Sequence, residues 1–154
     1  MISPQDFERL LPKVVHWVRE VEAAILLLGE PLPPEPKADA IAIGINRADD
    51  VRLIVRSQML LPIDAELGDL ATATGLINQG TAGMAFGHGI ILKFGAITRK
   101  LIAHELVHVK QYETRLGIEN FLREYLHEIL PPSRYGEGPM VQEAVKVASR
   151  IYGG

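Results

Sequence analysis

The sequence has no cysteine, no excess of positive charge and no long apolar run, and each absence excludes a class of protein. Without cysteine, the chain forms no disulfide, builds no thiolate metal site and has no thiol nucleophile. The formal net charge of −3 argues against a surface that neutralises nucleic-acid phosphates. The longest aliphatic run near the start, residues 23–28, is far too short to cross a bilayer. Any metal ligands must therefore come from the five histidines and the carboxylates.

The length and composition fit one globular domain covering residues 1–154. A chain of 154 residues can bury a substantial core, and 47% hydrophobic with 23% charged residues is ordinary for a globular protein. The first residues carry Asp6 and Glu8 and lack the basic head and apolar run of a secretory signal. We therefore expect a soluble, cytoplasmic protein.

One segment carries recognisable chemistry: His104, Glu105 and His108 spell H-E-x-x-H inside an apolar run. On a helix, residues four apart share a face, so both imidazoles can bind one metal ion. Zinc lowers the pKa of a bound water toward about 7, and the adjacent carboxylate can take the proton. A chance match is the alternative, but burying an unpaired His-Glu-His cluster would be costly. The motif predicts one Zn²⁺ held by His104 and His108, with Glu105 as general base.

A catalytic zinc site needs a third protein ligand and one open position. The metzincin extension is absent, because Gln111 stands where that motif has Gly and Thr114 where it has His. The downstream candidates are Glu119, Glu124, His127, Glu128, Glu137 and Glu143. Glu143 is favoured, since it begins an apolar helix whose Ala144 permits close packing against the helix of the motif.

The N-terminal part, residues 1–36, is predicted to be a helical brace followed by a proline-rich linker. Ser3 and Pro4 are typical of a helix start, Pro12 predicts a kink or a second helix, and Gly29 is expected to end the helix. Residues 31–36 are rich in proline and predict a stiff, extended linker.

Residues 37–154 are predicted to hold a sheet and the zinc-binding helices. The expected helices cover residues 37–43 (also compatible with a strand), 64–74, 98–116, 118–130 and a last helix beginning at Pro139. The expected strands are residues 51–57, which are β-branched and partly alternating, and 84–93. Thr98 is expected to cap the helix of the motif, and Gly117 to end it. Met140, Ala144, Val147 and Ile151 would form the buried stripe of the last helix.

Residues 104–113 resemble the H-E-x-x-H-V-x-Q-Y segment of small gluzincin-like zinc metallopeptidases, a group that includes bacterial domains whose substrates are unassigned. The resemblance extends through residues 83–88 and 121–126, and residues 139–144 look like that group's P-x-E-x-E-A element. It covers roughly residues 80–150. It implies that Glu143 is the third zinc ligand, while Val141 stands where the group has another acidic residue.

We therefore expect a mainly helical α+β domain in which a small antiparallel sheet packs on the zinc-binding helix. The predicted activity is zinc-dependent hydrolysis of a peptide bond in a peptide or protein substrate, which could pair with the strand before that helix. The candidates for stabilising the oxyanion are His88, Tyr112, Arg134 and Tyr135. Two rival functions are a zinc-bound but inactive scaffold or regulatory domain, and a metal-free helical interaction module.

Overall fold

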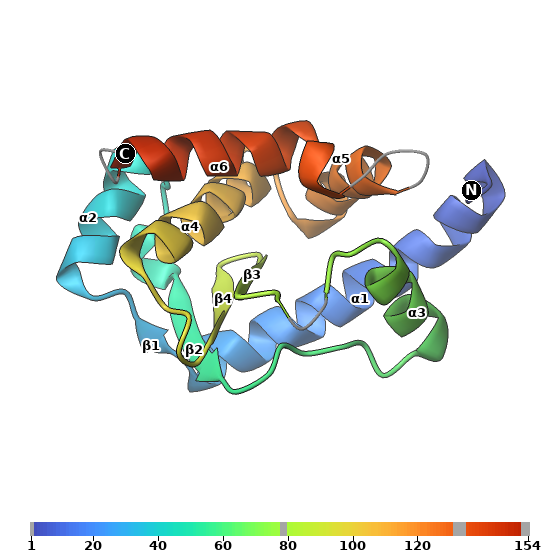
Figure 1. Cartoon of the computed structure of the whole chain (residues 1–154), viewed down its shortest axis with the longest axis horizontal. Coiled ribbons are helices and arrows are strands. Elements are labelled where there is room, and N and C mark those ends of the chain that lie inside the picture. The colour runs from blue at the N-terminus through green and yellow to red at the C-terminus, as the bar shows by residue number, and fades with distance from the viewer. Residues whose placement is uncertain (1, 78–79, 131–134, 152–154) are drawn as a thin grey trace.

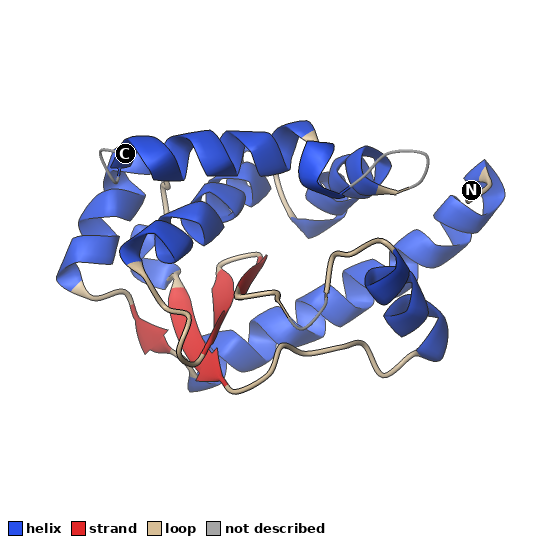
Figure 2. Cartoon of the chain, in the orientation of Figure 1, coloured by secondary structure: helices blue, strands red, loops and turns tan. Residues whose placement is uncertain are grey.

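The structure, a computed structural model, describes residues 2–77, 80–130 and 135–151. This part of the chain forms a mainly helical α+β domain, as expected (Figure 2). Its helices are α1 (Pro4–Leu28), α2 (Pro34–Ile43), α3 (Ala65–Ala73), α4 (Arg99–Thr114), α5 (Ile118–Ile129) and α6 (Pro139–Ile151). Its strands are β1 (Glu30–Pro31), β2 (Arg52–Arg56), β3 (Gly83–Phe86) and β4 (Gly89–Lys93), and short 3-10 turns cover Ala48–Asp50 and Tyr135–Glu137.

The four strands form one mixed sheet with the order β1-β2-β4-β3. The pairs β1–β2 and β3–β4 are antiparallel, but β2 and β4 are parallel, with Ile54 opposite Ile91. The expectation of an antiparallel sheet is therefore wrong for the central pair. After β2 the chain crosses over through α3 before it returns as β3 and β4, and such a crossover is what allows two strands to run in the same direction.

The strand expected over residues 84–93 is a hairpin of two strands. Its turn lies at Gly87 and His88, where Gly87 has a φ of 63°, a conformation that two-residue hairpin turns need and that glycine adopts readily. The backbone amide of His88 donates to the carboxylate of Glu22 at 2.8 Å, which fixes the turn against α1. Because the residues on both sides of the turn are apolar, the sequence pattern predicted one continuous strand.

The N-terminal part also departs from the expectation. The helix α1 begins as predicted, with the Ser3 side chain accepting from the Asp6 amide at 3.0 Å, but it continues through Pro12 without a second helix starting there. The segment expected to be an extended linker, residues 31–36, starts at the last residue of β1, and Pro34 already begins α2. Proline suits the first turn of a helix, because the amide hydrogen it lacks would have no partner there.

The sheet lies between α1 on one face and α4 on the other (Figure 1). Successive side chains of a strand point to opposite faces, and β4 follows this rule. Ile91 packs into a cluster with α1 and α5, whereas Ile90 and Leu92 pack into a second cluster with α2 and α4. The sheet thus holds α4 in place by apolar packing along the side of the helix.

Both ends of α4 are fixed by local hydrogen bonds. The Thr98 side chain accepts from the Leu101 amide at 3.0 Å, as expected for an N-cap. The other end differs from the prediction, because Leu116, with a φ of 64°, takes the left-handed position expected of Gly117. The amides of Leu116 and Gly117 donate to the carbonyls of Glu113 and Tyr112, both at 3.1 Å, which is the Schellman pattern.

The last helix, α6, lies alongside α4 (Figure 1). Its buried residues are Met140, Val141, Ala144 and Ala148, so Val147 and Ile151, which were expected in the buried stripe, are only partly buried. The two alanines are fully packed, at 0% and 1% exposure, and their small size lets the helices approach closely. This packing places the start of α6 beside the last turn of α4, where Gln111 lies.

Candidate metal centre

The two histidines of the motif lie together on one side of α4. The ring centroids of His104 and His108 are 5.2 Å apart, with the ring planes inclined at 72°. Ala103, Leu106 and Val107 on the same helix are at most 1% exposed, so the turns that carry the rings are anchored by packing. The arrangement can present two imidazole nitrogens to one metal ion.

A buried amide determines which ring nitrogen of His108 carries the hydrogen. Nδ1 of His108 lies 2.7 Å from Oε1 of Gln111. The amide nitrogen of Gln111 donates to the Met140 carbonyl at 3.0 Å and to Oε1 of Glu143 at 2.8 Å. Both of these partners can only accept, so the Gln111 oxygen must face the ring, and the hydrogen sits on Nδ1 of His108. Nε2 of His108 therefore keeps its lone pair, as a metal ligand must.

Burial keeps both imidazoles neutral. Desolvation lowers the pKa of His104, and it lowers that of His108 to about 4, with the charge of His104 contributing and the hydrogen bond to Gln111 opposing. His108 is 6% exposed and lies among the aromatic rings of Phe121 and Tyr125. Neutral imidazole is the form that binds a metal.

Glu105 is almost completely buried, at 5% exposure, and burial raises its pKa to about 8. Behind Glu105 and His108 lies a small cavity of about 60 Å³ with mostly apolar and aromatic walls. In front, a side-chain carbon on Gly83 would come within 3.2 Å of Oε2 of Glu105. Glycine at this position of β3 thus leaves room for the carboxylate.

An open cleft of about 540 Å³ reaches His104 and Glu105. It is lined by residues of the segment before β3, by α4, including His104 and Glu105, and by Val145 and Ala148 of α6. The strand β3 is the last in the sheet, and Gly83 on this strand borders the cleft. An extended chain lying in the cleft would therefore run beside the outer edge of β3, which pairs with no strand in the described part of the chain.

The described residues do not gather a third ligand. Within residues 2–77, 80–130 and 135–151, no three His, Asp or Glu side chains are close enough together to hold a metal ion. The Glu143 carboxylate accepts from Gln111 instead, so its role as the third ligand stays a prediction.

The other candidates for the third ligand have different neighbours. Glu124 pairs with Arg115 at 2.9 Å. Glu128 accepts from the Met140 amide at 2.8 Å. The His127 ring stacks on Phe7 with the centroids 4.0 Å apart. The structure brings none of these three to the pair His104 and His108.

Two of the four candidates for stabilising an oxyanion can be placed. The Tyr112 hydroxyl is buried and donates to the Ala85 carbonyl at 3.3 Å. Nε2 of His88 lies 2.8 Å from Glu113, and both line a different cavity from the one containing His104. Arg134 and the Tyr135 side chain lie outside the described residues.

Gln111 is a residue of this site that the H-E-x-x-H motif alone does not reveal. In the sequence it stands where a metzincin has glycine, and it lies within residues 104–113, which resemble the gluzincin-like segment. Two signals could have identified it: Gln111 follows His108 by three positions, so both share a helix face, and a glutamine inside an apolar run needs buried partners.

No protein-family model matches the chain, and no curated protein or solved structure matches it significantly. None of the helices in the described part has the length and apolar character needed to cross a membrane.

Proposed function

We propose that this protein hydrolyses peptide bonds with the help of one zinc ion bound by His104, His108 and Glu143. The observation that carries the proposal is the Gln111 amide, which contacts His108 through its oxygen and Glu143 through its nitrogen. One side chain thus orients two of the three proposed ligands, although these lie on different helices. Partners of this kind set the ring orientation and the tautomer of histidines that bind metals.

The residues present suit zinc in their chemistry. Two neutral imidazoles and one carboxylate are a donor set that catalytic zinc sites use. Bound zinc would supply a Lewis acid that polarises the scissile carbonyl and makes water a better nucleophile. The remaining steps fall to residues of the chain itself.

Glu105 is proposed to act as general acid and base. Its carboxylate would accept a proton from the attacking water and deliver that proton to the nitrogen of the leaving amine. Burial strengthens its affinity for a proton, and a nearby cation would favour the ionised form that a base requires. The position of Glu105 at both the cleft and the enclosed cavity suits transfer with little competing water.

The open edge of β3 is proposed to bind the substrate backbone. An extended peptide can add to a free strand edge by main-chain hydrogen bonds, and β3 lies directly beside Glu105. A carbonyl bound along this edge would be brought to the catalytic side chains. The proposed substrate is therefore an unfolded or extended segment rather than a helical one.

The proposal is tested with a library of internally quenched peptides. The protein is assayed as purified, after removal of metal by a chelator, and after one equivalent of zinc is restored. We expect cleavage in the first and third samples and none in the second. Binding of one zinc ion without any cleavage would support an inactive scaffold instead. Failure to bind zinc would contradict the proposed metal centre.

A further inference from the structure

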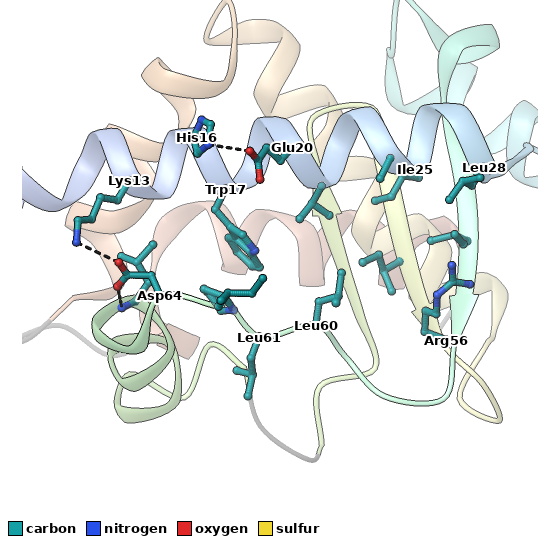
Figure 3. A pocket seen from close by; sticks show the side chains of 17 residues that line it. Lys13, His16, Trp17, Glu20, Ile25, Leu28, Arg56, Leu60, Leu61 and Asp64 are labelled. Atoms are coloured by element: carbon teal, nitrogen blue, oxygen red, sulfur yellow. Dashed lines mark hydrogen bonds and ion pairs between the residues drawn. The ribbon is translucent and has the colours of Figure 1, made fainter.

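A long groove lies on the face of the sheet opposite to α4, away from the proposed metal centre (Figure 3). Its volume is about 510 Å³. One wall is α1, from Lys13 to Leu28, and the other is the segment after β2 that carries Leu60 and Leu61. Most of the lining is apolar, and Trp17 lies between the two walls. A volume of this size with an apolar lining is typical of a small-molecule site.

Several apolar side chains that line the groove are exposed to solvent in the described part of the structure. Leu28, Leu60 and Leu61 are 64%, 45% and 50% exposed, although they face the same groove. By contrast Ile25 and Ile91, at 2% and 1% exposure, form a closed base. A ligand lying here would cover exposed apolar surface without displacing any core residue.

The groove is long enough for a linear ligand. Lys13 and Leu28 are 15 residues apart on α1, so the groove extends over about 22 Å at 1.5 Å per residue. A single extended hydrocarbon chain can lie along this length.

The charges at the two ends of the groove differ. At one end Lys13 pairs with Asp64 at 3.1 Å, so this end is neutralised. At the other end Arg56 faces the groove (Figure 3), and its guanidinium donates to the Val55 carbonyl at 2.9 Å. Among residues 2–77, 80–130 and 135–151, no carboxylate forms an ion pair with Arg56. This end therefore offers a cation to an anionic head group.

We propose that the groove binds a long-chain aliphatic carboxylate. Its chain would lie along α1 against Trp17 and Ile25, and its carboxylate would pair with Arg56. The ligand class follows from the long, mostly apolar groove and from the one cation at its end that has no ion pair within the described residues. This site is separate from the metal centre and does not depend on the proposed hydrolysis.

The test uses the fluorescence of Trp17, which is the only tryptophan in the chain and lines the groove. Hexadecanoate, kept below the concentration at which it forms micelles, is titrated into the full-length protein. We expect a saturable change in emission. Hexadecyltrimethylammonium, which has the same chain and a cationic head, should bind at least fivefold more weakly.

Two pairs of variants locate the ligand. Ala24 lines the groove and is exposed, whereas Ala23 is exposed without lining it. Ala24→Phe should therefore weaken hexadecanoate binding at least tenfold, and Ala23→Phe should leave it unchanged. Arg56→Gln should raise the dissociation constant about fivefold, as expected for an exposed ion pair, whereas Arg19→Gln, on α1 but outside the groove, should not.

Three results would overturn the proposal: no saturable response to hexadecanoate, equal binding of the carboxylate and the ammonium compound, or full binding by Ala24→Phe. Circular dichroism and zinc content, measured on each variant, separate loss of the site from loss of the fold.

Discussion

Nδ1 of His108 and Oε1 of Gln111 are 2.7 Å apart, and both side chains are buried. The orientation of the Gln111 amide is fixed by its two other partners, the Met140 carbonyl and the Glu143 carboxylate. This bond places the hydrogen of His108 on Nδ1 and leaves Nε2 as the ligand atom. The two bonds of the Gln111 amide nitrogen also tie α4 to the start of α6, where the proposed third ligand lies.

Gln111→Ala is expected to weaken zinc binding 10- to 100-fold, the usual cost of losing a residue that orients a ligand. The ring of His108 would lose its acceptor and Glu143 its donor. The dissociation constant is measured by competition with a chromogenic chelator. Gln58→Ala, at an exposed position, serves as the control. Unchanged affinity in Gln111→Ala would show that the amide does not orient the ligands.

Arg99→Ala is expected to destabilise the fold by about 2 kcal/mol, because it leaves the buried carboxylate of Asp39 without a partner. The Arg99 guanidinium contacts Asp39 with two hydrogen bonds of 2.9 and 2.8 Å, and Asp39 is 6% exposed. Arg9→Ala, which removes ion pairs that are about half exposed, should cost much less stability. Urea unfolding measures the free energy of unfolding of both variants. Equal losses of unfolding free energy in the two variants would contradict the expectation that the buried pair of Arg99 and Asp39 contributes more.

Glu113 should make the fold more sensitive to acid. Burial acts to raise the pKa of Glu113, but hydrogen bonds from His88 and from the backbone amides of Asn46 and Arg47 outweigh it, so the pKa lies below its usual value. A lowered folded-state pKa adds stability above the unfolded-state pKa, and this stability disappears as the pH falls through the folded-state value.

Glu113→Gln should therefore be less stable than wild type at pH 7, by about 1–3 kcal/mol. The difference should shrink as the pH falls below about 4.5. Urea unfolding between pH 3 and 7 measures it, with the exposed Glu119→Gln as the control. A difference that is constant across this range would mean that the Glu113 charge does not contribute.

Leu116→Gly is expected to stabilise the protein by about 1 kcal/mol. Leu116 has a φ of 64°, which costs a residue with a side chain about 1–2 kcal/mol, and it is 87% exposed, so little packing is lost. Leu116→Ala is the matched variant, since alanine removes the same side chain but keeps the unfavourable conformation. Thermal unfolding should therefore show a higher midpoint for Leu116→Gly than for Leu116→Ala.

Much of the fold could be predicted from local signals. The caps at Ser3 and Thr98 marked helix starts correctly, because a capping side chain acts within three residues of its own position. The parallel pairing of β2 with β4 could not be predicted, since it depends on contacts between segments far apart in the sequence. The break at Gly87 was missed because apolar strands flank it on both sides.

In the candidate site, too, only the features that lie within one helix could be predicted from the sequence. The spacing of His104 and His108 is a property of one helix, so the sequence alone predicts that their side chains share a face. The bond between Gln111 and Glu143 joins two helices, and no local pattern indicates it. The left-handed Leu116 also escaped prediction, because glycine is the usual residue in that position and Gly117 follows directly.

The most direct test of the proposed hydrolysis is the turnover of a cleavable peptide by zinc-loaded Glu105→Gln compared with zinc-loaded wild type. Glutamine has nearly the same size as Glu105 and should leave zinc content and fold unchanged, but its amide cannot take a proton from water. We predict equal zinc content and a loss of nearly all turnover. Wild-type turnover in Glu105→Gln would contradict the account, because Glu105 could then not be the base.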